Sequence, residues 1–120
     1  EVPAAALTVD ELVPHVDFIS IGTNDLTSYV MAADRTEPGV ADLLDDRSAA
    51  VWRLIEQAVT DALAGGIEAS VCGEMAGRPL EAFALVALMY GPVLMRLTQN
   101  ASLVPGCNFY STVQSEVGCK

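Results

Sequence analysis

The sequence predicts an α/β protein in which short parallel strands alternate with helices. Two short β-branched runs, at 16–21 and 68–72, stand on either side of a long helical pattern. A polar motif follows each run directly: SIGTNDLTSY begins at residue 20 and CGEMAG at residue 72. Polar groups at the carboxyl ends of parallel strands are typical of α/β barrels, which keep their chemistry at that end.

The helices are predicted from the spacing of apolar residues and from residues that typically begin or end helices. Thr8 has the N-cap position of a short helix over 8–12, and residues 25–31 begin another helix at the carboxyl end of the first strand. The longest helix starts after Ser48 and stops at Gly65 and Gly66. Its apolar residues recur with helical spacing on one face: Val51, Leu54, Ile55, Ala58, Val59, Ala62 and Leu63.

The last part of the chain has a weaker pattern. Pro79 suits the first position of a helix that we expect to run to about Met89. Residues 93–95 are then predicted as a third strand and 98–102 as a loop, and 108–120 show no sustained period. The chain is therefore divided into one region over 1–89, where the pattern is clear, and a divergent tail over 90–120.

The chain has 120 residues and supplies about three βα units. A complete barrel needs eight units and about 250 residues, so we interpret the chain as the C-terminal part of a (β/α)8 barrel. The hydrophobic content of 52% fits parallel strands that are covered on both faces. An incomplete barrel leaves strand edges and helix faces without partners, so self-association is expected.

Charge and composition exclude several classes of protein. The net charge of −10 argues against binding nucleic acid or an anionic membrane surface. No segment reaches the roughly 18 to 20 apolar residues that span a bilayer, and the start lacks a basic, apolar leader. The three cysteines lack CxxC spacing, which suggests neither a disulfide framework nor a zinc site. We therefore expect a soluble cytoplasmic protein with reduced thiols.

The residue types in the two motifs suit a small anionic substrate held through a divalent metal ion. Asp25 can bind Mg²⁺, and Asn24 with nearby backbone N–H groups can hold phosphate. Arg35 can form a fork on phosphate or carboxylate. Taken alone, Asn24 and Asp25 could be a turn pair, Arg35 a surface charge, and Cys72 a small core residue.

The run SIGTNDLTSY, the Asp34-Arg35 pair and CGEMAG resemble the phosphoenolpyruvate-binding barrel of the phosphoenolpyruvate–protein phosphotransferases, over 1 to about 88. These transferases start the bacterial sugar phosphotransferase relay or its nitrogen-related counterpart. The resemblance implies an enzyme that moves phosphoryl from phosphoenolpyruvate to a protein histidine and releases pyruvate. The isolated segment is expected to be inactive. A fragment of pyruvate phosphate dikinase or phosphoenolpyruvate synthase, or a truncated remnant without turnover, is the alternative.

The resemblance also implies roles for individual residues. Cys72 becomes the general acid that protonates C3 of the enolate, Asn24 and Arg35 hold the phosphoryl group, and Asp25 binds Mg²⁺ or Mn²⁺. Glu1 matches a strand end that carries the second metal carboxylate, although a terminal carboxylate is usually just solvated. A thiol with a free pKa of about 8.5 is protonated near neutral pH, which suits a general acid.

Two residues stand apart from this pattern. His15 lies between a helix and a strand, outside any motif, and we interpret it as a solvated connector. The resemblance places the phosphoacceptor histidine in a separate N-terminal domain, through which a histidine-containing phosphocarrier protein would be the partner. Arg78 replaces the acidic residue usual after Ala-Gly in the family, and a cation there opposes the dipole of the next helix.

Overall fold

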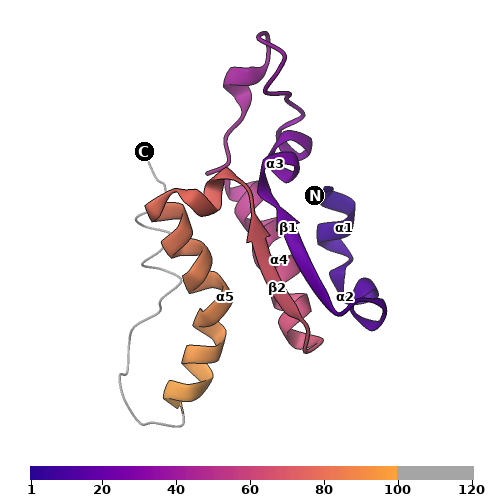
Figure 1. Cartoon of the computed structure of the whole chain (residues 1–120), viewed down its shortest axis with the longest axis vertical. Coiled ribbons are helices and arrows are strands. Elements are labelled where there is room, and N and C mark those ends of the chain that lie inside the picture. The colour runs from indigo at the N-terminus through magenta and orange to yellow at the C-terminus, as the bar shows by residue number, and fades with distance from the viewer. Residues whose placement is uncertain (100–120) are drawn as a thin grey trace.

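The structure is a computed structural model that describes the backbone of residues 1–99 and the side chains of residues 1–91. Within this part, two parallel strands, β1 (Phe18–Gly22) and β2 (Glu68–Cys72), form the sheet. Helix α4 (Ala49–Ala64) connects them and packs against both (Figure 1). The predicted α/β class is confirmed as a small mixed α/β unit with a parallel strand pair. The strand predicted at 68–72 is confirmed. The strand predicted at 16–21 is also present, but it begins two residues later and ends one residue later than predicted.

The segment before β1 is helical. Helix α1 (Pro3–Leu7) begins with a proline, whose missing N–H costs nothing at that position, and α2 (Val9–Leu12) leads into the 3-10 turn η1 (Val13–His15). Thr8 stands at the N-cap of α2 as predicted, but its hydroxyl donates to the carbonyl of Ala4 at 3.0 Å. The expected side-chain cap hydrogen bond is absent, and the hydroxyl points back to the end of α1 instead.

Helix α4 forms as its sequence predicts. The Ser48 hydroxyl accepts a hydrogen bond from the N–H of Ala50 at 3.3 Å, and the helix ends at Gly65. Gly66 follows with φ +77°, a conformation that favours glycine. The buried face of the helix consists of Val51, Ile55, Ala58, Val59 and Ala62. These residues form the centre of the core, together with Leu26, Met75 and Leu85.

The two faces of the strand pair differ. Ile21 is buried on the side of α4, and Ile19, Ala69 and Val71 pack against the same core. The alternate positions, Phe18, Ser20, Glu68, Ser70 and Cys72, are exposed within the described part of the chain. The expectation that both faces are covered is therefore not met among these residues. Ser20 and Cys72 lie on the open face because side chains alternate along a strand.

The last helix differs from the prediction. Helix α5 (Pro79–Gln99) continues ten residues beyond Met89, so the strand predicted at 93–95 is wrong, as is the start of the loop predicted at 98–102. A run of three apolar residues cannot distinguish strand from helix, and Leu94 and Met95 in this run are good helix formers. Exposed apolar side chains line the first part of α5: Leu80, Phe83, Val86 and Tyr90. The expectations for residues 100–120 lie outside the described residues.

Candidate active site

The candidate site lies where the two strands end. Gly22 and Cys72 are register partners, so the segments that follow β1 and β2 start side by side. Helix α3 (Thr23–Met31) follows β1 without an intervening loop, and the 3-10 turn η3 (Glu74–Gly77) follows β2. Both polar motifs of the sequence are thereby brought to one edge of the sheet (Figure 1). The sequence prediction that they would meet there is confirmed.

Two hydrogen bonds join the start of α3 to the chain after β2. The Thr23 hydroxyl donates to the carbonyl oxygen of Cys72 at 3.2 Å, and the N–H of Glu74 donates to Oδ1 of Asn24 at 3.1 Å. Gly73 lies between these bonds with φ +126°, and a Cβ there would collide with the Thr23 hydroxyl. Only glycine lets the two segments approach this closely without strain.

The Cys72 thiol is exposed on the open face of the strand pair. Its Sγ lies 3.5 Å from Oγ of Ser20 and 3.6 Å from the carbonyl oxygen of Ile21. A small core residue would be buried. The exposed thiol of Cys72 is instead accessible to a ligand. Sequence reasoning did not select Ser20, although its place two residues before Gly22 puts it on the same face as Cys72.

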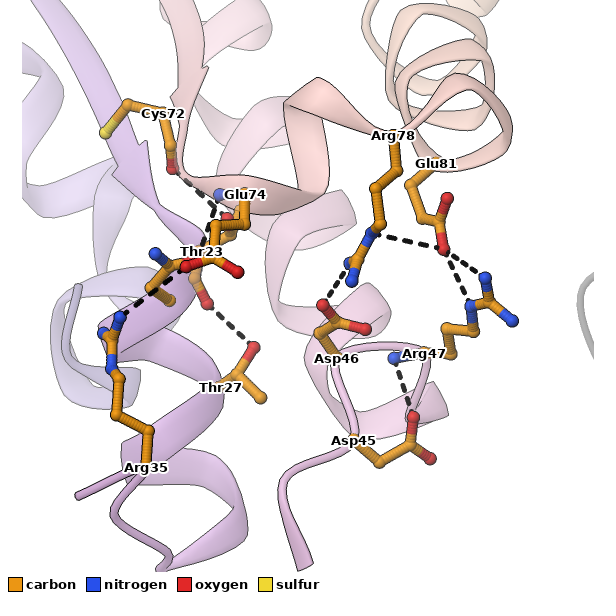
Figure 2. A network of polar contacts seen from close by, with 11 residues as sticks. Thr23, Thr27, Arg35, Asp45, Asp46, Arg47, Cys72, Glu74, Arg78 and Glu81 are labelled. Atoms are coloured by element: carbon orange, nitrogen blue, oxygen red, sulfur yellow. Dashed lines mark hydrogen bonds and ion pairs between the residues drawn. The ribbon is translucent and has the colours of Figure 1, made fainter. Parts of the chain in front are cut away.

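Arg35 lies between two carboxylates. Its guanidinium lies 3.4 Å from Oδ1 of Asp25. It also lies 3.9 Å from Oε1 of Glu74 (Figure 2). All three side chains are about half-exposed or more, at 49%, 53% and 77%. Ion pairs this exposed contribute little to stability, so an incoming phosphate or carboxylate can replace them at low cost. Glu74 was not among the predicted site residues.

A tight turn fixes the backbone next to Arg35. Oδ1 of Asp34 accepts hydrogen bonds from the N–H of Thr36 at 2.8 Å and from the Thr36 hydroxyl at 2.7 Å. The backbone bond, followed by the hydroxyl bond, lowers the pKa of Asp34 below its ordinary value. Asp34 therefore serves as a turn residue, and the Asp-Arg pair combines a structural carboxylate with a cation that faces the site.

Glu1 lies against the end of β1. A Cβ on Gly22 would lie 2.5 Å from Cγ and 2.9 Å from Oε1 of Glu1, so the glycine makes room for this side chain. Asp25 follows in the first turn of α3. Carboxylate oxygens suit Mg²⁺, which is usually held by one or two carboxylates together with substrate phosphate. Both side chains supply oxygen ligands of this kind, and the described residues contain no group of three or more His, Cys, Asp or Glu that could hold a metal ion.

His15 lies away from this site. It is exposed in η1, which leads into the amino end of β1, whereas the site lies at the carboxyl end. Its position between a helix and a strand agrees with a connector. The structure thus brings Asn24, Asp25, Arg35 and Cys72 to one edge and leaves the histidine outside it.

These features define an α/β unit in which an amide, an arginine and a thiol gather at the carboxyl ends of parallel strands. The family described as PEP-utilising enzyme, PEP-binding domain, matches residues 1–103. The chain belongs to this family of phosphoenolpyruvate-utilising enzymes.

Curated relatives agree with this membership. A phosphoenolpyruvate-protein phosphotransferase of Haloferax volcanii is 47% identical over 105 residues, which are 88% of this chain and 18% of the relative. One from Borreliella burgdorferi is 43% identical over 95 residues, 79% of this chain and 17% of the relative. A phosphoenolpyruvate synthase of Pyrococcus furiosus is 43% identical over 89 residues, which are 73% of this chain and 11% of the relative. The chain thus spans less than a fifth of each of these relatives.

The part of the chain with described backbone holds no helix that combines the length and apolar character needed to cross a membrane.

Proposed function

We propose that this chain forms part of a (β/α)8 domain that transfers phosphoryl from phosphoenolpyruvate to a protein histidine and releases pyruvate. The observation that carries the proposal is the pairing of Gly22 with Cys72. This register sets an exposed thiol beside the segment that holds Asn24 and Asp25. An acid and an anion-binding group are then available to one small substrate. By analogy with the named relatives, the partner is a phosphocarrier protein and the setting is the cytoplasm.

Substrate binding relies on the charged groups at the start of α3. Arg35 exchanges its contacts with Asp25 and Glu74 for the phosphate or carboxylate of phosphoenolpyruvate, which offers a bidentate partner. Oδ1 of Asn24 accepts a hydrogen bond from the N–H of Glu74. The two hydrogens of the Asn24 side-chain amide are therefore left to bind phosphate oxygens. The first N–H groups of α3 point to the same side and favour an anion.

The reaction separates into two steps. In the first, the P–O bond of phosphoenolpyruvate breaks, its electron pair stays on the enolate oxygen, and a bond forms between phosphorus and a histidine nitrogen. In the second, the Cys72 thiol donates its proton to C3 of the enolate, which gives pyruvate. The thiolate then takes a proton from water. In the reverse direction the thiolate removes the proton from the methyl group of pyruvate.

Glu1 and Asp25 would hold Mg²⁺ in this proposal, and the ion, when bound, would neutralise charge on the phosphoryl and enolate oxygens. The support is the oxygen-only donor set at the end of β1 and the space that Gly22 leaves for Glu1.

A second candidate has a specific observation in its favour, namely the 43% identity to the Pyrococcus furiosus phosphoenolpyruvate synthase. The same thiol would then act mainly in the direction that forms phosphoenolpyruvate from pyruvate. Net formation of phosphoenolpyruvate without phosphorylation of a carrier protein would favour this alternative.

The experiment is single-turnover phosphorylation of the intact protein that contains this segment, with phosphoenolpyruvate labelled in the phosphoryl group. Arg35→Gln should slow the transfer by about 10²- to 10³-fold, the range typical for loss of one charge-stabilising donor. Arg53→Gln is the matched control, because Arg53 is an exposed arginine of α4 outside the polar motifs that follow the two strands. Transfer at the wild-type rate by Arg35→Gln would overturn the proposal.

A further inference from the structure

A second charged cluster lies on the other side of η3 from Arg35 (Figure 2). Its centre is Glu81, which is only 4% exposed. Oε1 of Glu81 accepts a hydrogen bond from Nε of Arg47 at 2.7 Å, and the Arg47 Nη2 also lies 2.7 Å from it. Nε of Arg78 lies 3.6 Å from the same oxygen, and Arg78 also pairs with Asp46. We call these four residues, Asp46, Arg47, Arg78 and Glu81, the clamp.

The clamp connects two parts of the chain that are far apart in sequence. Asp46 and Arg47 precede α4, and the N–H of Arg47 donates to Oδ1 of Asp45 at 2.9 Å, which fixes that loop. Arg78 and Glu81 stand at the start of α5, where the carbonyl of Arg78 accepts the first helical hydrogen bond at 2.8 Å. The start of α5 is thereby tied to the start of α4.

Turn η3 is held at both ends and in the middle. Asn24 accepts a hydrogen bond from the N–H of its first residue, Glu74, and Thr23 binds the carbonyl of Cys72 just before the turn. The side chain of Met75 is fully buried, and Arg78 follows the last residue of the turn. The turn is therefore suspended between the strand that ends in Cys72 and the clamp. A shift of Arg78 would move the turn, and with it the backbone on which the thiol is placed.

The burial of Glu81 makes the clamp selective for one arrangement. A buried carboxylate without a partner is strongly unfavourable. Pairing with Arg47 and Arg78 removes this penalty only when the segment before α4 and the start of α5 are both in place. The hydrogen bond that Arg78 donates to the Asp46 carboxylate raises the pKa of Arg78, so this arginine stays charged across the accessible pH range. Glu81 in the first turn of α5 also offsets the unfavourable charge of Arg78 near the helix N-terminus.

We propose that Arg78 and Glu81, together with Asp46 and Arg47, are positioning residues that hold the Cys72–Gly77 segment in register with the substrate groups of α3. This inference rests on the proposed role of Cys72. A stabilising role for α5 alone is the competing account, since any ion pair at a helix start can stabilise that helix. If the clamp positions the turn, breaking it should loosen the Cys72–Gly77 segment. If it only stabilises α5, breaking it should leave that segment unchanged.

Amide hydrogen exchange distinguishes these accounts on the chain itself. The N–H groups of Glu74, Ala76 and Arg78 donate within or at the edges of the turn, to Asn24, Gly73 and Met75 respectively. In Arg78→Gln their exchange should speed up by about tenfold or more, since a hydrogen bond to a charged group is lost. The amides in the middle of α4 should keep their rates. Arg53→Gln, which removes an exposed arginine of α4, should change neither set.

Rescue by a conservative variant adds a second readout. Arg78→Lys keeps a cation near Asp46 but loses the planar fork, so exchange in the turn should fall between the wild type and Arg78→Gln. Unchanged exchange of the three turn amides in Arg78→Gln, or an equal increase in α4, would overturn the positioning role.

The activity of the intact protein supplies the last arm. Arg78→Gln should lower the rate of proton exchange at C3 of pyruvate while the KM for phosphoenolpyruvate stays near its wild-type value, because Arg35 is untouched. A raised KM with unchanged proton exchange would contradict the proposal. Absence of proton exchange in the wild-type protein would refute the proposed function instead, and the amide exchange result would still decide whether the clamp positions the turn.

Discussion

Oδ1 of Asn24 accepts a hydrogen bond from the backbone N–H of Glu74 at 3.1 Å, across 50 residues of sequence. This contact ties the helix after β1 to the turn after β2, so the anion-binding motif and the thiol motif form one unit. It also fixes the orientation of the Asn24 amide, since a backbone N–H requires an acceptor. The two halves of the candidate site are therefore expected to respond together to substitutions in either segment.

Gly73 is expected to be intolerant of any side chain. Gly73→Ala places a Cβ against the Thr23 hydroxyl and demands φ +126° of a residue that avoids it. Backbone strain of this kind costs about 1 to 3 kcal/mol. Urea unfolding should show this loss. Gly77→Ala is the matched control, because a Cβ there meets nothing within 4 Å. Equal stability of the two variants would show that the close approach at Gly73 is unimportant.

Asp25 is expected to contribute to metal affinity. Titration with Mn²⁺ in the presence of phosphoenolpyruvate should show weaker binding in Asp25→Asn of the intact protein. Loss of an outer-shell partner costs about 10- to 100-fold in affinity, so loss of a ligand should cost at least as much. Asp42→Asn, at an exposed carboxylate in the turn η2 (Ala41–Leu43), should bind Mn²⁺ like the wild type. Unchanged affinity in Asp25→Asn would remove this residue from the metal site.

The pH dependence of stability should report on Glu81. Its own backbone N–H and the Arg47 guanidinium hold the pKa of this carboxyl below its ordinary value of 4.5. Because the pKa is lowered in the folded state, charged Glu81 stabilises the fold at pH values above its ordinary pKa. This contribution is lost as the pH falls through the lowered pKa. Glu81→Gln should therefore unfold at lower urea than the wild type at pH 7, and the gap should close on acidification.

The control for this pH series is Glu11→Gln, at an exposed carboxylate in α2. Its urea midpoint should follow that of the wild type across the whole range. A gap between Glu81→Gln and the wild type that stays constant down to low pH would show that packing, and not the charge of Glu81, is responsible.

The sequence predicted those parts of the fold that depend on local pattern. Helix α4 has a serine cap, a periodic apolar face and a glycine stop, and each of these signals is contained within a few residues. The meeting of Asn24 with the Cys72 segment was also predictable, because parallel strands place their carboxyl ends at one edge. Both predictions use rules that need no knowledge of distant contacts.

The contacts of the clamp, which sequence analysis missed, depend on long-range packing. Arg47 and Glu81 are 34 residues apart, and no local spacing indicates that they pair. Arg78 was seen only as a cation that opposes a helix dipole, whereas its partner Asp46 lies 32 residues earlier. The extension of α5 past Met89 was missed because a short apolar run leaves the choice between strand and helix open.

The most direct test of the central claim separates phosphoryl transfer from proton delivery at Cys72. In the intact protein, Cys72→Ala should still allow one transfer of phosphoryl from phosphoenolpyruvate to the histidine, because Asn24 and Arg35 remain. Incorporation of solvent deuterium into the methyl group of pyruvate should fall by about 10²- to 10⁴-fold, as for loss of a general acid. Cys107→Ala should retain both activities. If Cys72→Ala also incorporates deuterium at the wild-type rate, the thiol is not the acid and the proposed mechanism is wrong.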